Sequence, residues 1–130
     1  MTKRIHVAVG VIINDNNEIL LAKRPEHLHQ GGKWEFPGGK VEAGETVTQA
    51  LARELEEEVA LEVKATKPFM ELSFDYPDKQ VLLDIHTVTA FAGDARGLEG
   101  QQIAWVPRNE LTNYDFPEAN KAILEKLLRH

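Results

Sequence analysis

The chain has 130 residues and no cysteine, and 42% of its residues are hydrophobic. This length and hydrophobic content favour one compact domain over residues 1–130 and argue against intrinsic disorder. Without cysteine, neither a disulfide framework nor a thiolate metal site is possible. The formal net charge of −6 disfavours stable binding to nucleic acid or to an anionic membrane, because both need a basic surface.

No stretch of the sequence approaches the roughly 18 apolar residues that span a bilayer, and the N-terminus lacks the apolar core of a signal peptide. We therefore expect a cytoplasmic protein without membrane contact. The acidic charge raises a question about anionic ligands, because an acidic protein that binds a phosphate ester must supply positive charge locally. Metal ions held by carboxylates would supply it.

The first third of the chain has the pattern of strands separated by turns. Apolar residues alternate over 5–13, which predicts a strand with one buried face. The polar segment 14–17 predicts a turn, and a return strand begins at 19. A short strand is expected at 33–36, after which Pro37-Gly38-Gly39 is expected to break regular structure.

A helix is expected next. Thr46 and Gln49 fit a capping box, in which each side chain binds the other residue's backbone N–H. Apolar residues then recur at helical spacing from Val47 to Val59. The spacing predicts an amphipathic helix that begins after Thr46.

The rest of the chain predicts two longer strands at 67–75 and 80–92, joined by a turn at 76–79. A short strand follows around 103–106, and Pro117 suits the first position of a last helix. Strands, helix, strands and helix in this order predict an α/β (α+β) fold with a mixed β-sheet between helices.

The predicted helix carries an unusual set of carboxylates. Glu54, Glu57 and Glu58 share one arc of the helix, at the edge of its apolar stripe, whereas Glu56 points away. Glu54 and Glu58 form a like-charge pair one turn apart, and burial beside apolar groups disfavours their ionised forms further. A divalent cation would remove both penalties, and oxygen ligands suit Mg²⁺ or Mn²⁺ better than zinc.

A second interpretation needs no metal. The glutamates would then form a solvated acidic face with ion pairs such as Arg53 with Glu57, which is what most runs of glutamate are. The helix alone supports the two interpretations equally, and the loop before it favours the metal site.

This loop and helix together resemble the Nudix box, G-x5-E-x7-R-E-U-x-E-E-x-G-U, in which U is aliphatic. The matching residues are Gly39, Glu45, Arg53, Glu54, Leu55, Glu57, Glu58 and Leu61. One position departs, because Ala60 stands where the family has glycine. In the family this glycine takes the left-handed conformation that closes the helix, so the departure concerns the end of the helix and not the carboxylates.

The resemblance extends along nearly the whole chain to the 8-oxo-dGTP diphosphatases of the Nudix family, through Ala8-Val9-Gly10, 16–19, 35–40, 115–117 and Ala119-Asn120. It implies the Nudix fold and Mg²⁺-dependent hydrolysis of 8-oxo-dGTP to 8-oxo-dGMP and pyrophosphate. Such an enzyme removes oxidised guanine nucleotides from the DNA precursor pool.

The resemblance also implies roles for individual residues. A Mg²⁺ site, in which Mn²⁺ can substitute, is expected from the carbonyl of Gly38 and the carboxylates of Glu54, Glu57, Glu58 and Glu99. Glu54, Arg53 and Glu99 are the expected catalytic residues. Arg53 would orient the glutamates, Glu45 would support the loop, and Glu99 would serve as a further ligand or as general base.

The expected substrate-binding residues are Arg24, His29, Glu35, Phe36, Pro37, Gly38, Lys79 and Asn120. Asn120 matches the asparagine that reads the purine edge, although without the resemblance it would be an ordinary residue of a helical turn. Lys79 stands where the subfamily has arginine, so it keeps the charge and loses the planar fork of the guanidinium.

Two other functions remain open at this point. In the first, the chain is a Nudix hydrolase that acts on another nucleoside triphosphate or on a nucleoside diphosphate derivative. Alternatively it is a catalytically inactive module that senses nucleotides, which the complete set of glutamates disfavours. In each case we expect a monomer whose partner is a small nucleotide.

Overall fold

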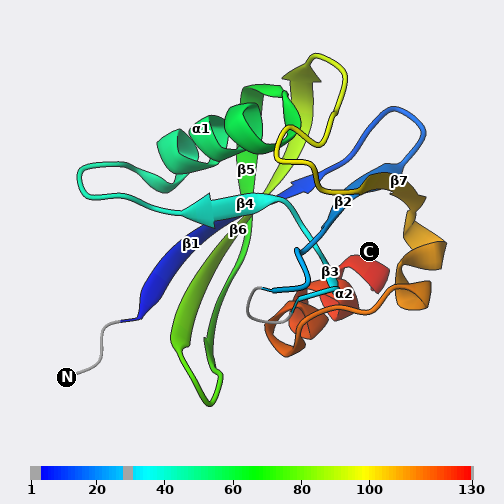
Figure 1. Cartoon of the computed structure of the whole chain (residues 1–130). Coiled ribbons are helices and arrows are strands. Elements are labelled where there is room, and N and C mark those ends of the chain that lie inside the picture. The colour runs from blue at the N-terminus through cyan, green and yellow to red at the C-terminus, as the bar shows by residue number, and fades with distance from the viewer. Residues whose placement is uncertain (1–3, 28–30, 130) are drawn as a thin grey trace.

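The computed structural model describes residues 4–27 and 31–129, and their helices lie on either side of strands (Figure 1). The helices are α1 (Val47–Val59) and α2 (Lys121–Leu128), with short 3-10 helices η1 (Arg108–Asn113) and η2 (Glu118–Asn120). The strands are β1 (Ile5–Ile12), β2 (Glu18–Lys23), β3 (Trp34–Glu35), β4 (Gly38–Lys40), β5 (Glu62–Asp75), β6 (Gln80–Ala92) and β7 (Ile103–Pro107). No helix within the described residues is long and apolar enough to cross a membrane.

The strands form two sheets. The larger is mixed and has the order β4-β1-β6-β5, with β1 and β6 parallel and the other pairs antiparallel. The smaller is antiparallel and has the order β3-β2-β7. The expected α/β fold with a mixed sheet is confirmed, whereas the division into two sheets was not predicted.

The alternation of β1 places its two faces against different helices. Val9 and Val11 belong to an apolar cluster that contains Ile123 of α2. Ala8 and Ile12 belong to a second cluster, which contains the buried leucines of α1. The mixed sheet therefore lies between α1 and α2 (Figure 1), as the order of the elements predicted. The alternating pattern predicted one buried face for β1, whereas both of its faces are buried from Ala8 to Ile12.

The prediction that Pro37-Gly38-Gly39 breaks regular structure is wrong for its two glycines. Gly38 and Gly39 belong to β4, which pairs antiparallel with β1 so that Gly39 lies opposite Ala8. A Cβ atom on Gly38 would collide with the carbonyl oxygen of Ala8. Glycine at this position thus permits the close approach of the two strands rather than a turn.

Two other boundaries differ from the prediction. The helix expected to begin at Pro117 does not, because Pro117 precedes the 3-10 turn η2 and α2 begins only at Lys121. β5 begins at Glu62, ahead of the expected residue 67, and its pairing with β6 contains register shifts between Val63 and Met70. These irregularities interrupt the strict alternation by which a strand is recognised in a sequence.

Both ends of α1 have defined caps. The N-terminus has the predicted capping box, because the hydroxyl of Thr46 accepts the N–H of Gln49 at 3.1 Å and the amide oxygen of Gln49 accepts the N–H of Thr46 at 2.9 Å. The helix ends at Val59, and Ala60 takes the left-handed conformation with φ of 63°. Alanine therefore adopts the backbone conformation that the family's glycine adopts easily, at a steric cost of about 1–2 kcal/mol.

We expect Ala60→Gly to raise the free energy of unfolding by about 0.5–1 kcal/mol, since relief of the left-handed strain exceeds the added entropy of the unfolded chain. Urea unfolding monitored by circular dichroism measures the change. Ala52→Gly, in the middle of α1, is the matched control and should lower stability. Equal losses in both variants would contradict the strain at Ala60.

Candidate active site

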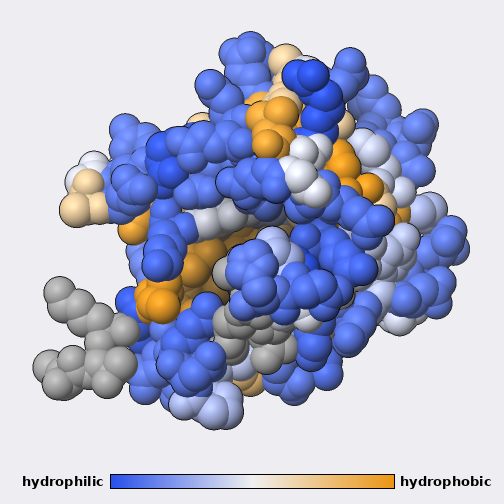
Figure 2. All heavy atoms as spheres, in the orientation of Figure 1, coloured by the Kyte–Doolittle hydropathy of each residue, from blue (hydrophilic) through white to orange (hydrophobic). Residues whose placement is uncertain are grey.

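A cleft of about 230 Å³ opens between the mixed sheet and the C-terminal segment. Its floor consists of Ile5, Val7 and Val9 of β1 with Val81 and Leu83 of β6. Figure 2 shows a hollow with hydrophobic residues on its floor and hydrophilic residues around its rim. An apolar floor beside a few polar groups suits a flat, partly apolar ligand.

The structure brings most of the predicted substrate-binding residues together in this cleft. Those that line it are Arg24, Glu35, Phe36, Gly38, Lys79 and Asn120. Pro37 is buried behind the lining, where its carbonyl accepts the N–H of Gly10 at 2.8 Å. His29 lies outside the described residues.

Three cationic side chains line the cleft although the protein is acidic. They are Arg24, Lys40 and Lys79, and Arg24 also donates a 2.8 Å hydrogen bond to Glu35. Burial lowers the pKa of Lys79, and the positive charge of Arg24 lowers it further. An anionic ligand would relieve this crowding of positive charge.

Asn120 presents a buried amide to the cleft. Asn120 is 9% exposed. It occupies the N-cap of α2, but its side chain makes no capping hydrogen bond. Within the described residues the amide has no hydrogen-bond partner. Buried polar groups are normally satisfied, so this amide indicates a position where a ligand binds.

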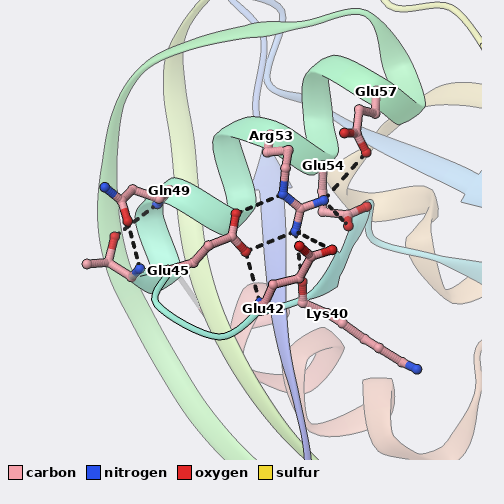
Figure 3. A network of polar contacts seen from close by, with 8 residues as sticks. Lys40, Glu42, Glu45, Gln49, Arg53, Glu54 and Glu57 are labelled. Atoms are coloured by element: carbon pink, nitrogen blue, oxygen red, sulfur yellow. Dashed lines mark hydrogen bonds and ion pairs between the residues drawn. The ribbon is translucent and has the colours of Figure 1, made fainter.

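Arg53 links α1 to the loop before it, as Figure 3 shows. Its guanidinium donates two hydrogen bonds to Glu45, at 2.8 and 3.0 Å, and one to the carbonyl of Lys40 at 3.1 Å. It also donates to Glu54 at 2.9 Å and to Glu57 at 3.5 Å. The hydrogen bonds from Arg53 lower the pKa of Glu45 to about 2.

The loop is closed by Glu45, and Glu54 fits against β4. The carboxylate of Glu45 accepts the N–H of Glu42 at 2.9 Å, which ties the two ends of the turn together. A Cβ atom on Gly39 would collide with the carboxylate of Glu54. Glycine at this position of β4 thus leaves the space in which that carboxylate lies.

The remaining glutamates of the box differ in exposure. The sequence predicted that both Glu57 and Glu58 lie at the edge of the apolar stripe. In the structure Glu58 is 8% exposed, whereas the side chain of Glu57 is 59% exposed. Burial, together with the negative charges of Glu35 and Glu99, raises the pKa of Glu58 to about 8, although an N–H hydrogen bond from Gly38 acts in the opposite direction. The carboxylates of Glu35 and Glu99 are therefore close enough to Glu58 to disfavour its negative charge.

Glu99 lies near Glu58 because the loop after β6 is attached to the end of α1. The side chain of Gln101 accepts the N–H of Glu99 at 2.9 Å and donates to the carbonyl of Glu58 at 3.0 Å. The N–H of Leu98 donates to the same carbonyl at 3.0 Å. Gln101, which the sequence analysis did not single out, thus holds Glu99 at this end of the site.

The metal ligands expected from the resemblance do not converge on one point in this structure. Among residues 4–27 and 31–129, no three acidic or histidine side chains are arranged closely enough to hold a metal ion. Arg53 engages the carboxylates of Glu54 and Glu57 instead. The donor set nevertheless suits a hard cation, because it consists of oxygen atoms and because a positive charge would stabilise the ionised form of Glu58.

The sequence analysis missed one lining residue with a specific contact. Tyr76 follows β5 and lines the cleft, and its hydroxyl accepts the N–H of Ala119 at 2.8 Å. A tyrosine in a turn gives no local signal for a contact 43 residues away. Phe36, one of the expected substrate-binding residues, lines the cleft while its ring stacks on Phe116 at 5.3 Å between centroids.

The raised pKa of Glu58 predicts how stability depends on pH. The folded, metal-free protein keeps a proton that the unfolded chain loses near the ordinary value of 4.5. Its free energy of unfolding should therefore fall as the pH rises from about 5 to about 8, by at most about 1.4 kcal/mol per pH unit. Urea unfolding in the presence of EDTA across this range measures the slope.

Glu58→Gln should flatten this slope and raise stability above about pH 7, because the amide does not ionise. Glu57→Gln, at an exposed position of the same helix turn, should keep the slope of the unsubstituted protein. If the stability of Glu58→Gln still falls with pH as steeply as that of the unsubstituted protein, then ionisation of Glu58 is not the cause of the slope.

The sequence is similar to known proteins over nearly its whole length. The profile of the NUDIX domain family matches residues 8–126. The chain is 41% identical over 127 residues to the 8-oxo-dGTP diphosphatase of Escherichia coli (strain K12), with 98% of both proteins covered. It is 34% identical over 120 residues to the CTP pyrophosphohydrolase of the same organism, with 92% of this chain and 89% of that protein covered.

The fold is similar to a solved structure of MutT, described for the psychrophilic fish pathogen Aliivibrio salmonicida and the mesophile Vibrio cholerae. The TM-score is 0.86 and the identity 47%, with 98% of both chains covered. The likeness thus holds in sequence and in three dimensions over nearly the whole chain. The chain belongs to the Nudix hydrolase family.

Proposed function

We propose that this protein is a Mg²⁺-dependent 8-oxo-dGTP diphosphatase that releases 8-oxo-dGMP and pyrophosphate. The observation that carries the proposal is the buried amide of Asn120, which has no hydrogen-bond partner within the described residues. It lines a cleft that three cationic side chains also line. Relatives that cover nearly the whole chain support it, because the 41% identical protein of Escherichia coli is an 8-oxo-dGTP diphosphatase.

The amide of Asn120 suits the oxidised base. Oxidation at C8 turns N7 of guanine from a hydrogen-bond acceptor into a donor, while O6 remains an acceptor. A carboxamide offers one acceptor and two donors in a plane, so it can bind the N7–H and O6 together. Guanine presents two acceptors at the same edge and would leave the amide oxygen of Asn120 unsatisfied.

The cationic side chains and the carboxylates have different roles toward the triphosphate. Arg24, Lys40 and Lys79 would attract and orient phosphate oxygens at the mouth of the cleft. The carbonyl of Gly38 with Glu54, Glu57, Glu58 and Glu99 would hold Mg²⁺, for which Mn²⁺ can substitute. When bound, the metal lowers the pKa of a bound water and neutralises charge on the phosphates.

The hydrolytic step then needs a proton acceptor. A carboxylate, that of Glu54 or Glu99, takes a proton from the attacking water. The water oxygen bonds to the β-phosphorus, the bond from this phosphorus to the bridging oxygen breaks, and that oxygen leaves with the monophosphate. Arg53 keeps Glu54 oriented through its 2.9 Å hydrogen bond.

The CTP pyrophosphohydrolase among the relatives suggests a second substrate class. A pyrimidine lacks the N7 and O6 edge that Asn120 would bind, and the lower identity of 34% also favours the first substrate. The inactive nucleotide-sensing alternative is disfavoured by the presence of every glutamate of the box.

We further propose that the protein acts in the cytoplasm as a monomer, on the nucleotide precursor pool. The residues proposed to bind the nucleotide and to assist hydrolysis all belong to one chain and fall within residues 8–126, which match the NUDIX domain family. No second subunit is therefore needed to complete the site. We propose that residues 1–130 form a single Nudix domain.

Glu54→Gln should lower Mg²⁺-dependent turnover by on the order of 10³ or more, because a metal ligand or base is lost while the shape is kept. Pyrophosphate release measures turnover. Glu56→Gln, at an exposed position of the same helix, is the matched control and should keep activity within about twofold. Turnover near that of the unsubstituted protein in Glu54→Gln would show that α1 does not carry the chemistry.

Asn120→Ala should lower the kcat/KM for 8-oxo-dGTP by at least about tenfold and that for dGTP much less, because two base contacts are lost. The assay compares 8-oxo-dGTP, dGTP and CTP in the presence of Mg²⁺. Asn113→Ala, at an exposed position at the end of η1, is the control. If the unsubstituted protein hydrolyses all three nucleotides equally, the proposed substrate is wrong.

A further inference from the structure

Tyr76 connects two parts of the cleft that are far apart in the sequence. It lies in the turn between β5 and β6, which also carries Lys79. Its hydroxyl accepts a hydrogen bond of 2.8 Å from the backbone N–H of Ala119, and Ala119 is the residue before Asn120 in η2. All four residues line the cleft.

The N–H of Ala119 needs an acceptor from elsewhere in the molecule. It belongs to the first turn of η2, where backbone N–H groups have no partner within the helix. The N-cap residue is Pro117, which makes no side-chain capping bond, and Ala119 is 3% exposed. Tyr76 therefore supplies the cap that the local sequence lacks.

The position of the Tyr76 hydroxyl is itself fixed by the hairpin. The N–H of Tyr76 donates to the carbonyl of Lys79 at 2.8 Å, and the ring packs on Phe74 with centroids 4.8 Å apart. Asn120 makes no capping bond that would hold its own side chain. The placement of its amide thus depends on η2, and that of η2 depends on the hydroxyl of Tyr76.

We propose that Tyr76 is a positioning residue that sets base selectivity by holding η2, and so the amide of Asn120, at the cleft. This inference rests on the function proposed above. Two directional hydrogen bonds to the base weaken when the amide shifts by a few tenths of an ångström. The glutamates lie on α1 and on the loop after β6, so the chemistry is not affected in the same way.

The test compares Tyr76→Phe, which keeps the ring and removes the hydroxyl, with the matched control Tyr114→Phe. Tyr114 is partly buried, packs edge-on against Trp34 and is not part of the cleft lining. The ratio of kcat/KM for 8-oxo-dGTP to that for dGTP should fall about threefold to tenfold in Tyr76→Phe, through a higher KM for 8-oxo-dGTP. In Tyr114→Phe the ratio should stay within about twofold.

Two measurements separate positioning from a general structural role. In an Asn120→Ala background, Tyr76→Phe should not change the ratio further, because the residue through which it acts is absent. Hydrogen exchange at the amide of Ala119 should be faster in Tyr76→Phe than in Tyr114→Phe. A selective parent protein with an unchanged ratio in Tyr76→Phe would overturn this role alone, whereas an unselective parent protein would remove the proposed function and this role with it.

Discussion

The arrangement of the glutamates on α1 and in the loop before it depends on the hydrogen bonds of the Arg53 guanidinium. It binds Glu45 in the loop, the carbonyl of Lys40 at the end of β4, and the carboxylates of Glu54 and Glu57 on α1. Without this cation the loop and the helix would bring several negative charges together with nothing to offset them. An arginine suits the position better than a lysine, because its planar fork donates in several directions at once.

The site separates opposite charges across a short distance. The negative charges of Glu35 and Glu99 act on the buried carboxyl of Glu58, and the cationic side chains of Arg24, Lys40 and Lys79 line the neighbouring cleft. In the absence of a ligand, the charged forms of Glu58 and Lys79 are disfavoured by burial and by nearby like charges. The pKa of Glu58 is therefore raised and that of Lys79 lowered. A metal ion with a polyphosphate would satisfy both groups together, since one is positive and the other negative.

The residues proposed to recognise the base and those proposed to act in hydrolysis lie in different parts of the fold. The floor of the cleft comes from β1 and β6, and the polar group that faces it comes from η2 near the C-terminus. The acidic residues lie on α1, on the other face of the mixed sheet, and on the loop that Gln101 attaches to α1. This separation would let selectivity change through Tyr76 and Asn120, which are proposed to position and bind the base, while the glutamates proposed to act in hydrolysis stay in place.

The sequence by itself determined α1 and the residues that it presents. The capping box, the helical spacing of apolar residues and the row of glutamates depend on contacts within about four residues, which are set by the local chain. The face of β1 that carries Val9 and Val11 was predictable for the same reason, because side chains alternate along any strand. Burial of the opposite face against α1 was not predictable in this way. The resemblance to the family predicted the residues that would bind the substrate. Of these, Pro37 lies behind the lining of the cleft.

Only the tertiary structure decided which distant segments meet. β4 forms because Gly38 allows a close approach to Ala8, and η2 is capped by Tyr76 from 43 residues earlier. The same holds for Glu99, which lies near Glu58 through Gln101. Such contacts leave no periodic signal in the sequence, because they arise when the sheet and the helices pack and not when each element forms.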